Sequence, residues 1–265
     1  MQHLKNRIHQ HDALEFCKKL SPNSIDLIIC DGPYGVTNHS WDKVGNIQEY
    51  NLRLIQLFSE LLVDGGSLYL FRKSDCIDFI DYRKHLQLKS KIVWYQPSRL
   101  AQGRLNYTNN YDLICYFTKG KPRCFNLDDI RVPQMVELEH RKRCENVPSV
   151  KNGMYKKTRF HAEGKNPGNV WGDIKQLTYK SKELLNRKFL NTVQKPESLM
   201  RRLILASTNK GDLVFDPFCG SGTVPVCCLE NGRDFMATEI NPEFCNAARN
   251  RIRQQKSKKQ QLSLL

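Results

Sequence analysis

The sequence contains no apolar run close to the roughly 20 residues that a membrane-spanning helix needs. Its first segment, MQHLKNRIHQHD, lacks the apolar stretch of a secretory signal. Its ten cysteines include no C-x-x-C pair, and several lie inside apolar runs, where a free thiol packs as a small hydrophobic group. These absences predict a cytoplasmic protein with reduced thiols, without a disulfide framework, a zinc site or a membrane segment.

The motifs of two common chemistries are missing as well. No G-x-x-x-x-G-K-[ST] occurs, which excludes the usual ATP phosphate loop, and no H-E-x-x-H or similar spacing occurs, so no metal is predicted. Acidic residues are scarce, because 27 Asp and Glu stand against 42 Lys and Arg for a formal net charge of +15. This excess favours a polyanionic partner, since Lys and Arg release counterions from phosphates; a charged, soluble surface is the alternative.

Apolar strands alternate with helical patterns at both ends of the 265-residue chain. This alternation predicts an α/β fold with a doubly wound, mostly parallel, seven-stranded sheet. A short strand before Asp12 is followed by expected strands at 24–30, 67–71, 90–96, 111–117, 212–216 and 234–240. Helices are expected from Ala13 and at 47–63, 76–86, 196–208, 224–232 and 242–255.

The segment 119–188 breaks this alternation and holds 17 basic but only 8 acidic residues. We interpret it as an inserted basic lobe that could bind a polyanion such as DNA. It would lie between two halves of one core, at 1–118 and 189–250, and a basic tail at 251–265 is expected to fray. A solvated, disordered insertion is the alternative. Six basic residues of the lobe are predicted to contact phosphates: Arg141, Lys142, Arg143, Lys156, Lys157 and Arg159.

The stretch IICDGPYGV at 28–36 places functional groups at the end of a buried strand. Ligands of open α/β sheets bind at the carboxyl ends of strands, which is where Asp31 lies. The Asp31 side chain and the Gly32 carbonyl could accept hydrogen bonds from an exocyclic amine, while Pro33 stiffens the turn and Tyr34 stacks on the base. A base within a duplex would have to be flipped out to reach them. An ordinary turn is the alternative.

A second strand end, VFDPFCGSGTV at 214–224, resembles a nucleoside-binding loop. Gly220 and Gly222 allow close approach of a ligand, and the helix that follows presents free amide N–H groups. Glu239 ends the next strand, where an acidic residue is expected to bind ribose hydroxyls. Because the loop offers little to neutralise a pyrophosphate, a nucleoside without phosphates fits better, and S-adenosylmethionine is the common one.

These motifs resemble those of the beta-class DNA amino-methyltransferases, in which the target-amine motif precedes the cofactor motif. DGPY at 31–34 resembles their D-P-P-Y, and DPFCGSGT at 216–223 resembles D-P-F-x-G-S-G-T. The segment at 192–208 is similar to the family's H-P-T-Q-K-P region, and HDAL at 11–14 resembles the turn that contacts the cofactor adenine. Two departures are Gly32 in place of the first proline, and Asn191-Thr192-Val193 in place of H-P-T.

The resemblance implies the fold of S-adenosylmethionine-dependent methyltransferases, that cofactor, and double-stranded DNA as partner; homodimers are common in the family. Catalytic roles fall to Asp31, Gly32, Pro33 and Tyr34. Cofactor contacts fall to Asp12, Ala13, Asp31, Lys195, Pro196, Phe215, Asp216, Phe218, Cys219, Gly220, Ser221, Gly222, Glu239 and Asn241.

The initial aspartate of the target motif favours the 6-amino group of adenine as the methyl acceptor. The 4-amino group of cytosine is the first alternative. An RNA or protein-glutamine methyltransferase is a second alternative. A non-catalytic DNA-binding protein, whose site has decayed through Gly32, is a third.

Overall fold

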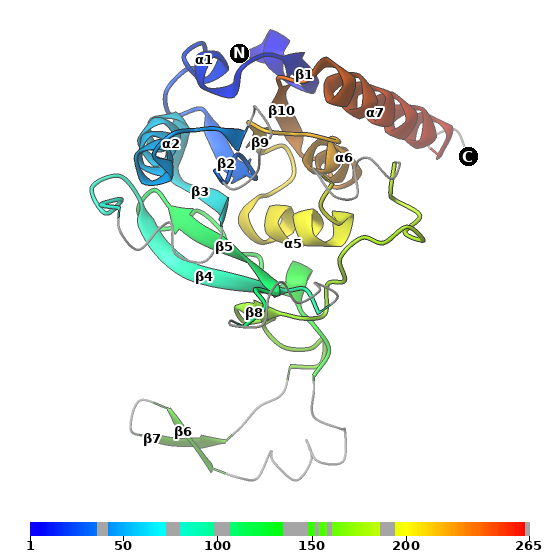
Figure 1. Cartoon of the computed structure of the whole chain (residues 1–265). Helices are drawn as coiled ribbons and strands as arrows, with labels where there is room; N and C mark the ends of the chain where they lie inside the picture. Colours follow the sequence, from blue (N-terminus) through cyan, green and yellow to red (C-terminus); the bar gives the residue numbers. More distant parts are fainter. Residues whose placement is uncertain are drawn as a thin grey trace.

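A computed structural model describes residues 1–35, 42–72, 80–97, 107–134, 148–151, 154–157, 161–185 and 194–262. Its centre is an eight-stranded sheet in the order β1-β10-β9-β2-β3-β5-β4-β8 (Figure 1). Neighbouring strands are parallel except for β5, which is antiparallel to β3 and β4, so the expected mostly parallel sheet is confirmed. The strands are β1 Arg7–Gln10, β2 Ile25–Cys30, β3 Leu62–Arg72, β4 Gln87–Tyr95, β5 Tyr111–Thr118, β8 Val170–Trp171, β9 Leu213–Asp216 and β10 Asp234–Glu239.

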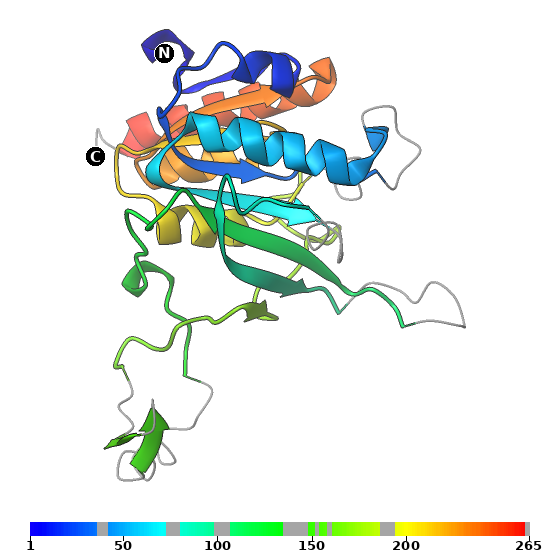
Figure 2. The same cartoon turned by 90° about the vertical axis from the view of Figure 1, so that its left-hand side faces the viewer.

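Helices cover both faces of the sheet, as Figures 1 and 2 show. One face carries α5 Glu197–Ser207, α6 Thr223–Glu230 and α7 Pro242–Leu262, and the other carries α1 Ala13–Cys17 and α2 Ile47–Leu61. Strand β2 illustrates why: Leu27 and Ile29 point into the apolar cluster beneath α5, whereas Ile28 and Cys30 point into the cluster beneath α2. No helix of the described residues combines the length and the apolar character that crossing a membrane requires.

The eighth strand corrects the expected count of seven and comes from the predicted lobe. Strand β8 pairs in parallel with β4, and its Trp171 is buried in the core. The Trp94 indole nitrogen donates to the Ile174 carbonyl at 2.8 Å, which ties the following residues to the sheet. A strand of two residues has too little periodicity to be recognised in a sequence. The domain boundaries themselves stay a prediction.

The rest of the predicted lobe includes a two-stranded hairpin that lies away from the central sheet in both views (Figures 1 and 2). It pairs β6 Pro148–Lys151 with β7 Met154–Lys157, so Lys156 and Lys157 lie on a strand. The other four predicted phosphate contacts, Arg141, Lys142, Arg143 and Arg159, lie outside the described residues. Short 3-10 helices lie at η1 Gln2–Leu4 and η3 Asp128–Ile130.

Two expected helices differ from the structure. Of the helix expected at 76–86, residues 76–79 lie outside the described residues, and 80–86 form turns, with the Leu86 amide donating to the Tyr82 carbonyl and Tyr82 packing edge-on against Phe117 at 5.2 Å. Helix α2 ends at Leu61, and β3 begins at once and runs through 64–66. Gly65 has φ +76° and its amide donates to the Lys119 carbonyl, so these glycines belong to the first part of β3 instead of separating a helix from a strand.

The basic tail does not fray at residue 251, because α7 continues to Leu262. Arg251 is buried and donates to the Thr223 hydroxyl at 3.1 Å, and its guanidinium pairs with Glu197 at 2.5 Å. These contacts anchor α7 to α5 and α6. The basic charge of the tail suggested that it is solvated. Arg251, however, has its partners on other helices, and the sequence does not show which helices pack together.

Candidate active site

Three neighbouring strands end in carboxylates at one edge of the sheet. Asp31 follows β2, Asp216 ends β9, and Glu239 ends β10, in the sheet order β10-β9-β2. A small cavity lies there, lined by Asp31, Lys195, Asp216, Phe218, Cys219 and Thr223 among others. The two turns singled out in the sequence therefore lie side by side, because parallel strands bring their carboxyl ends together.

Asp31 is the residue on which two other predicted site residues converge. The Tyr34 hydroxyl donates to its Oδ1 at 2.5 Å, and the Lys195 ammonium donates to its Oδ2 at 2.6 Å. The side chains of Asp31 and Lys195 are mostly buried, with 16% and 17% of their surfaces exposed, respectively. Lys195, which lies 164 positions after Asp31 in the chain, thus fixes this carboxylate together with Tyr34. The catalytic and cofactor roles of these residues stay predictions.

The target turn is held rigidly although Gly32 replaces a proline. A Cβ at Gly32 would lie 2.7 Å from the Phe218 ring, so the glycine-rich loop packs directly on this glycine. One oxygen of Asp42 accepts the amides of Tyr34 and Gly35 at 2.6 and 2.9 Å, and Asp42 is buried. Packing and a buried carboxylate therefore supply the order that the missing proline ring would give.

The glycine-rich loop is fastened to the neighbouring strand through Glu239. Its Oε2 accepts the Gly220 amide at 2.9 Å, and its Oε1 accepts the Asn241 amide at 2.8 Å. Gly222 caps α6 with φ +79°, the left-handed region that glycine adopts without strain. Burial raises the pKa of the Glu239 carboxyl, and the two amides oppose that shift. Glu239 thus positions the loop and keeps free lone pairs for a ligand.

Other predicted cofactor contacts lie around the same edge but not all face it. Asp12 caps α1 by accepting the Glu15 amide at 3.0 Å, above the buried Ala13. Phe215 is fully buried, and its ring stacks on Phe16 at 6.2 Å, so only its backbone can reach a ligand at the edge. Pro196 caps α5, Cys219 and Ser221 are buried in the loop, and Asn241 accepts amides at the start of α7.

Asp216 is a buried carboxylate in an acidic environment. It is 3% exposed and accepts only the Phe218 amide, at 3.2 Å, among its described contacts. Burial raises its pKa well above the usual range, and the charges of Asp31 and Glu239 raise it further. The site therefore favours a cationic ligand, which would offset this concentration of negative charge.

This shift makes the stability of the fold depend on pH. An unfolded Asp loses its proton near pH 4, whereas Asp216 in the fold keeps it to higher pH, so its burial costs stability increasingly as pH rises above 4. Asp216→Asn keeps the acceptor for Phe218 and removes this cost. We expect its Tm to exceed that of the wild type at pH 8 by at least about 3 °C, and by less at pH 5. An advantage equal at both pH values in calorimetry would contradict the assignment.

Sequence reasoning missed two residues that support the site, Asp42 and Arg72. Arg72 ends β3, is fully buried, and lies with its guanidinium carbon 6.0 Å from the centre of the Tyr34 ring. A signal for it existed, because a charge that ends an apolar strand is the same pattern that identified Asp31 and Glu239. Asp42 gave no such signal, since its contact depends on how the chain returns to the turn.

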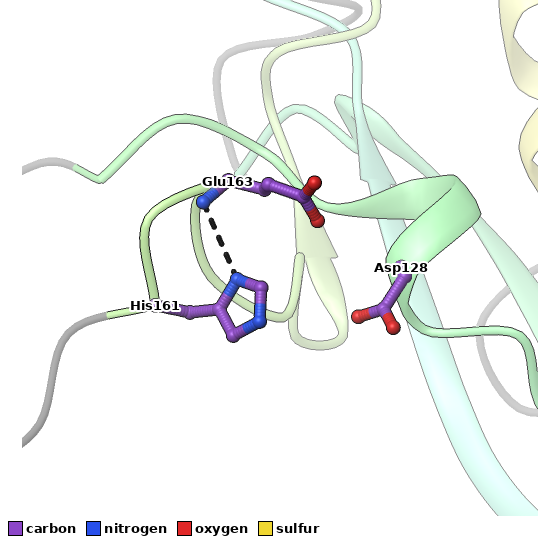
Figure 3. A group of neighbouring side chains, drawn as sticks. All are labelled: Asp128, His161 and Glu163. Carbon is purple, nitrogen blue, oxygen red and sulfur yellow. Dashed lines mark hydrogen bonds between the residues drawn. The ribbon is translucent and has the colours of Figure 1, made fainter.

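A different group of potential metal ligands lies within the predicted lobe, near the point where residues 132 and 165 pair. Asp128, His161 and Glu163 are exposed, and one ligand atom from each lies within 4.8 Å of the others (Figure 3). The Glu163 amide donates to Nδ1 of His161 at 3.3 Å, which leaves the proton of a neutral imidazole on Nε2. Asp128 already accepts from Arg131 at 2.7 Å. As arranged, the group is hydrogen-bonded internally and offers no free imidazole nitrogen.

Comparison with known proteins agrees with the motifs. A family model described as DNA methylase matches residues 25–250. The DNA adenine methyltransferase YhdJ of Escherichia coli (strain K12) is 34% identical over 255 residues, which cover 91% of this chain and 80% of that protein. The Type II methyltransferase M1.MboII of Moraxella bovis is 29% identical over 252 residues, covering 92% of this chain and 95% of that protein.

Solved structures share the fold at lower sequence identity. The crystal structure titled M1.HpyAVI-SAM complex gives a TM-score of 0.60 at 22% identity, covering 93% of this chain and 98% of that one. The PvuII DNA methyltransferase, titled cytosine-N4-specific, gives 0.62 at 15% identity, covering 92% and 85%. With a family match over most of its length and a 34% identical relative, this chain belongs to the DNA methylase family.

Proposed function

We propose that the protein transfers the methyl group of S-adenosylmethionine to the 6-amino group of adenine in duplex DNA. The observation that carries this proposal is the Asp31 carboxylate, held by Tyr34 and Lys195 beside the glycine-rich loop. Adenine is favoured because the target motif begins with aspartate and because the 34% identical relative is named an adenine methyltransferase. Other relatives are named Type II methyltransferases, which suggests a role in restriction and modification.

The residues of this edge fit the cofactor chemically. When bound, S-adenosylmethionine supplies an electrophilic methyl group on a sulfonium and also carries an ammonium. Asp31 would offer negative charge to these two cations, Asp216 would do so once a bound cation lowers its raised pKa, and Glu239 would accept ribose hydroxyls. Gly222 has no room for a side chain, since a Cβ would lie 2.9 Å from that of Ala248, so this glycine lets the start of α6 pack closely against α7.

The target turn would act on the amine through position and charge. Asp31 and the Gly32 carbonyl accept hydrogen bonds from the amino group, which directs the nitrogen lone pair at the methyl carbon. Positive charge develops on that nitrogen as its bond to the methyl carbon forms and the bond from that carbon to sulfur breaks, which leaves a neutral thioether. A fixed carboxylate stabilises this charge without reorganisation until the nitrogen gives up one proton to water. Tyr34 would stack on the base once it leaves the duplex. Lys195 and the Tyr34 hydroxyl keep the carboxylate in place throughout.

The basic segment would hold the duplex while the base enters the site. Its positive charge suits the phosphate backbone, whose contacts position a protein without reading sequence. Lys156 and Lys157 on β7 belong to this proposed surface. Dimerisation stays a prediction.

The test is methyl transfer from labelled S-adenosylmethionine to mixed-sequence duplex DNA, followed by digestion and mass spectrometry of the nucleosides. We expect N6-methyladenine. N4-methylcytosine would keep the chemistry and change the target base, and label in RNA or protein substrates alone would change the substrate class. No methylated product, with duplex binding intact, would overturn the enzymatic proposal and favour a DNA-binding protein with a decayed site.

A further inference from the structure

The end of strand β3 supports both groups that hold Asp31. The Lys195 ammonium lies 5.6 Å from the centre of the Phe71 ring, and the Arg72 guanidinium lies 6.0 Å from the centre of the Tyr34 ring. Tyr34 and Lys195 are the two donors to Asp31. Two consecutive residues of one strand, which point to opposite faces, therefore buttress the two donors separately.

Arg72 is held in place by two neutral hydrogen-bond acceptors. Its Nε donates to Asn51 Oδ1 at 2.6 Å, and its Nη1 donates to the Phe71 carbonyl at 2.6 Å. Its Nη2 is buried and has no acceptor in the described part of the chain, and the same is true of the Asn51 amide nitrogen. None of the ion pairs among the described residues includes Arg72, although none of its surface is exposed.

Stability alone does not account for such a residue. A buried charge loses its hydration, and well-packed apolar residues of similar size often replace buried ionic groups without loss of stability. A described contact places the ring of Tyr34 beside the guanidinium. The attraction between a cation and a π-system is strongest where water is excluded, and the guanidinium side of this pair is fully buried.

We propose that Arg72 is a positioning residue for the target base and acts through the Tyr34 ring. Asn51 and the Phe71 carbonyl fix the guanidinium, and the guanidinium fixes the plane of the ring. The hydrogen bond of the Tyr34 hydroxyl to Asp31 restrains the far end of this side chain, and the hydrogen bond of its backbone amide to Asp42 restrains its main chain. The ring is thereby ready to stack on a flipped base. This inference rests on the proposed function.

The test compares Arg72→Met, which removes the charge at similar length, with Arg72→Lys, which keeps it. Methylation is measured on a short duplex of the sequence that the wild type methylates. We expect Arg72→Met to lower kcat/KM for DNA about tenfold, within the range of desolvated cation–π contacts, and Arg72→Lys to recover most of it. Affinity for S-adenosylmethionine should not change, because Arg72 is absent from the cofactor loop. If Arg72→Met does not fold, Arg72→Gln takes its place.

Two readouts separate positioning of the base from a merely structural role. Arg72→Met should weaken binding to the intact duplex but not to a duplex with an abasic target, which offers nothing to stack on. In a Tyr34→Leu background the substitution should have no further effect, whereas in Tyr34→Phe it should keep its full effect. Equal weakening on both duplexes, or an unchanged effect in Tyr34→Leu, would overturn the proposal. A wild type that transfers no methyl group refutes the proposed function instead.

Discussion

Asp31→Ala should lower kcat for methyl transfer by about a thousandfold, the upper range for loss of one group that stabilises developing charge. Alanine removes both oxygens that Tyr34 and Lys195 hold, so the amine loses its acceptor and the Lys195 ammonium loses its partner. Asp31→Asn keeps one acceptor oxygen but no negative charge. We therefore expect it to retain more activity than alanine and less than the wild type.

Single-turnover methylation of duplex DNA measures this effect, together with DNA binding and thermal unfolding to show that each variant folds. Asp81→Ala is the matched control, because Asp81 is an exposed aspartate whose ion pair with Lys84 spans 3.7 Å. Exposed pairs contribute little, so this control should stay within about twofold of the wild type. An Asp31→Ala variant as active as the control would remove Asp31 from the reaction.

The sequence predicts those parts of the site in which a charged residue directly follows, or ends, an apolar strand. Asp31, Asp216 and Glu239 each follow a buried strand, and parallel pairing brings such ends to one edge. The same rule applies to Arg72, which ends β3, but it was not recognised as a charged residue at the end of a strand. Asp42 lay beyond this reasoning, because its hydrogen bonds to the turn depend on tertiary geometry.

The fold was predictable to a similar limit. Alternating strands and helices fix the α/β class, because each pattern repeats over many residues. Strand β8 and the path of 80–86 were not predictable, since two paired residues and a turn in which only Leu86 is buried carry no period. Phe215 was predicted to contact the cofactor; strand alternation directs its side chain to Phe16 in the core, which leaves its backbone for that contact.

Gly222→Ala should lower the free energy of unfolding by about 3 kcal/mol, the sum of two separate costs. An alanine at φ +79° adopts the left-handed region, at roughly 1–2 kcal/mol. Its Cβ would also lie 2.9 Å from the Cβ of Ala248 on α7, and such overpacking costs typically about 1–3 kcal/mol. The corresponding fall in Tm is roughly 6–12 °C for a chain of this size.

Gly120→Ala separates the two costs in the same measurement. Gly120 has φ +76° and nothing within 4 Å of the Cβ position, so alanine there carries the backbone strain alone. In denaturant unfolding we expect Gly222→Ala to lose clearly more stability than Gly120→Ala, and Ala248→Gly to restore part of the difference. Equal losses in the two glycine variants would mean that α7 yields to the new methyl group. The close approach of α7 would then not be what requires glycine at the start of α6.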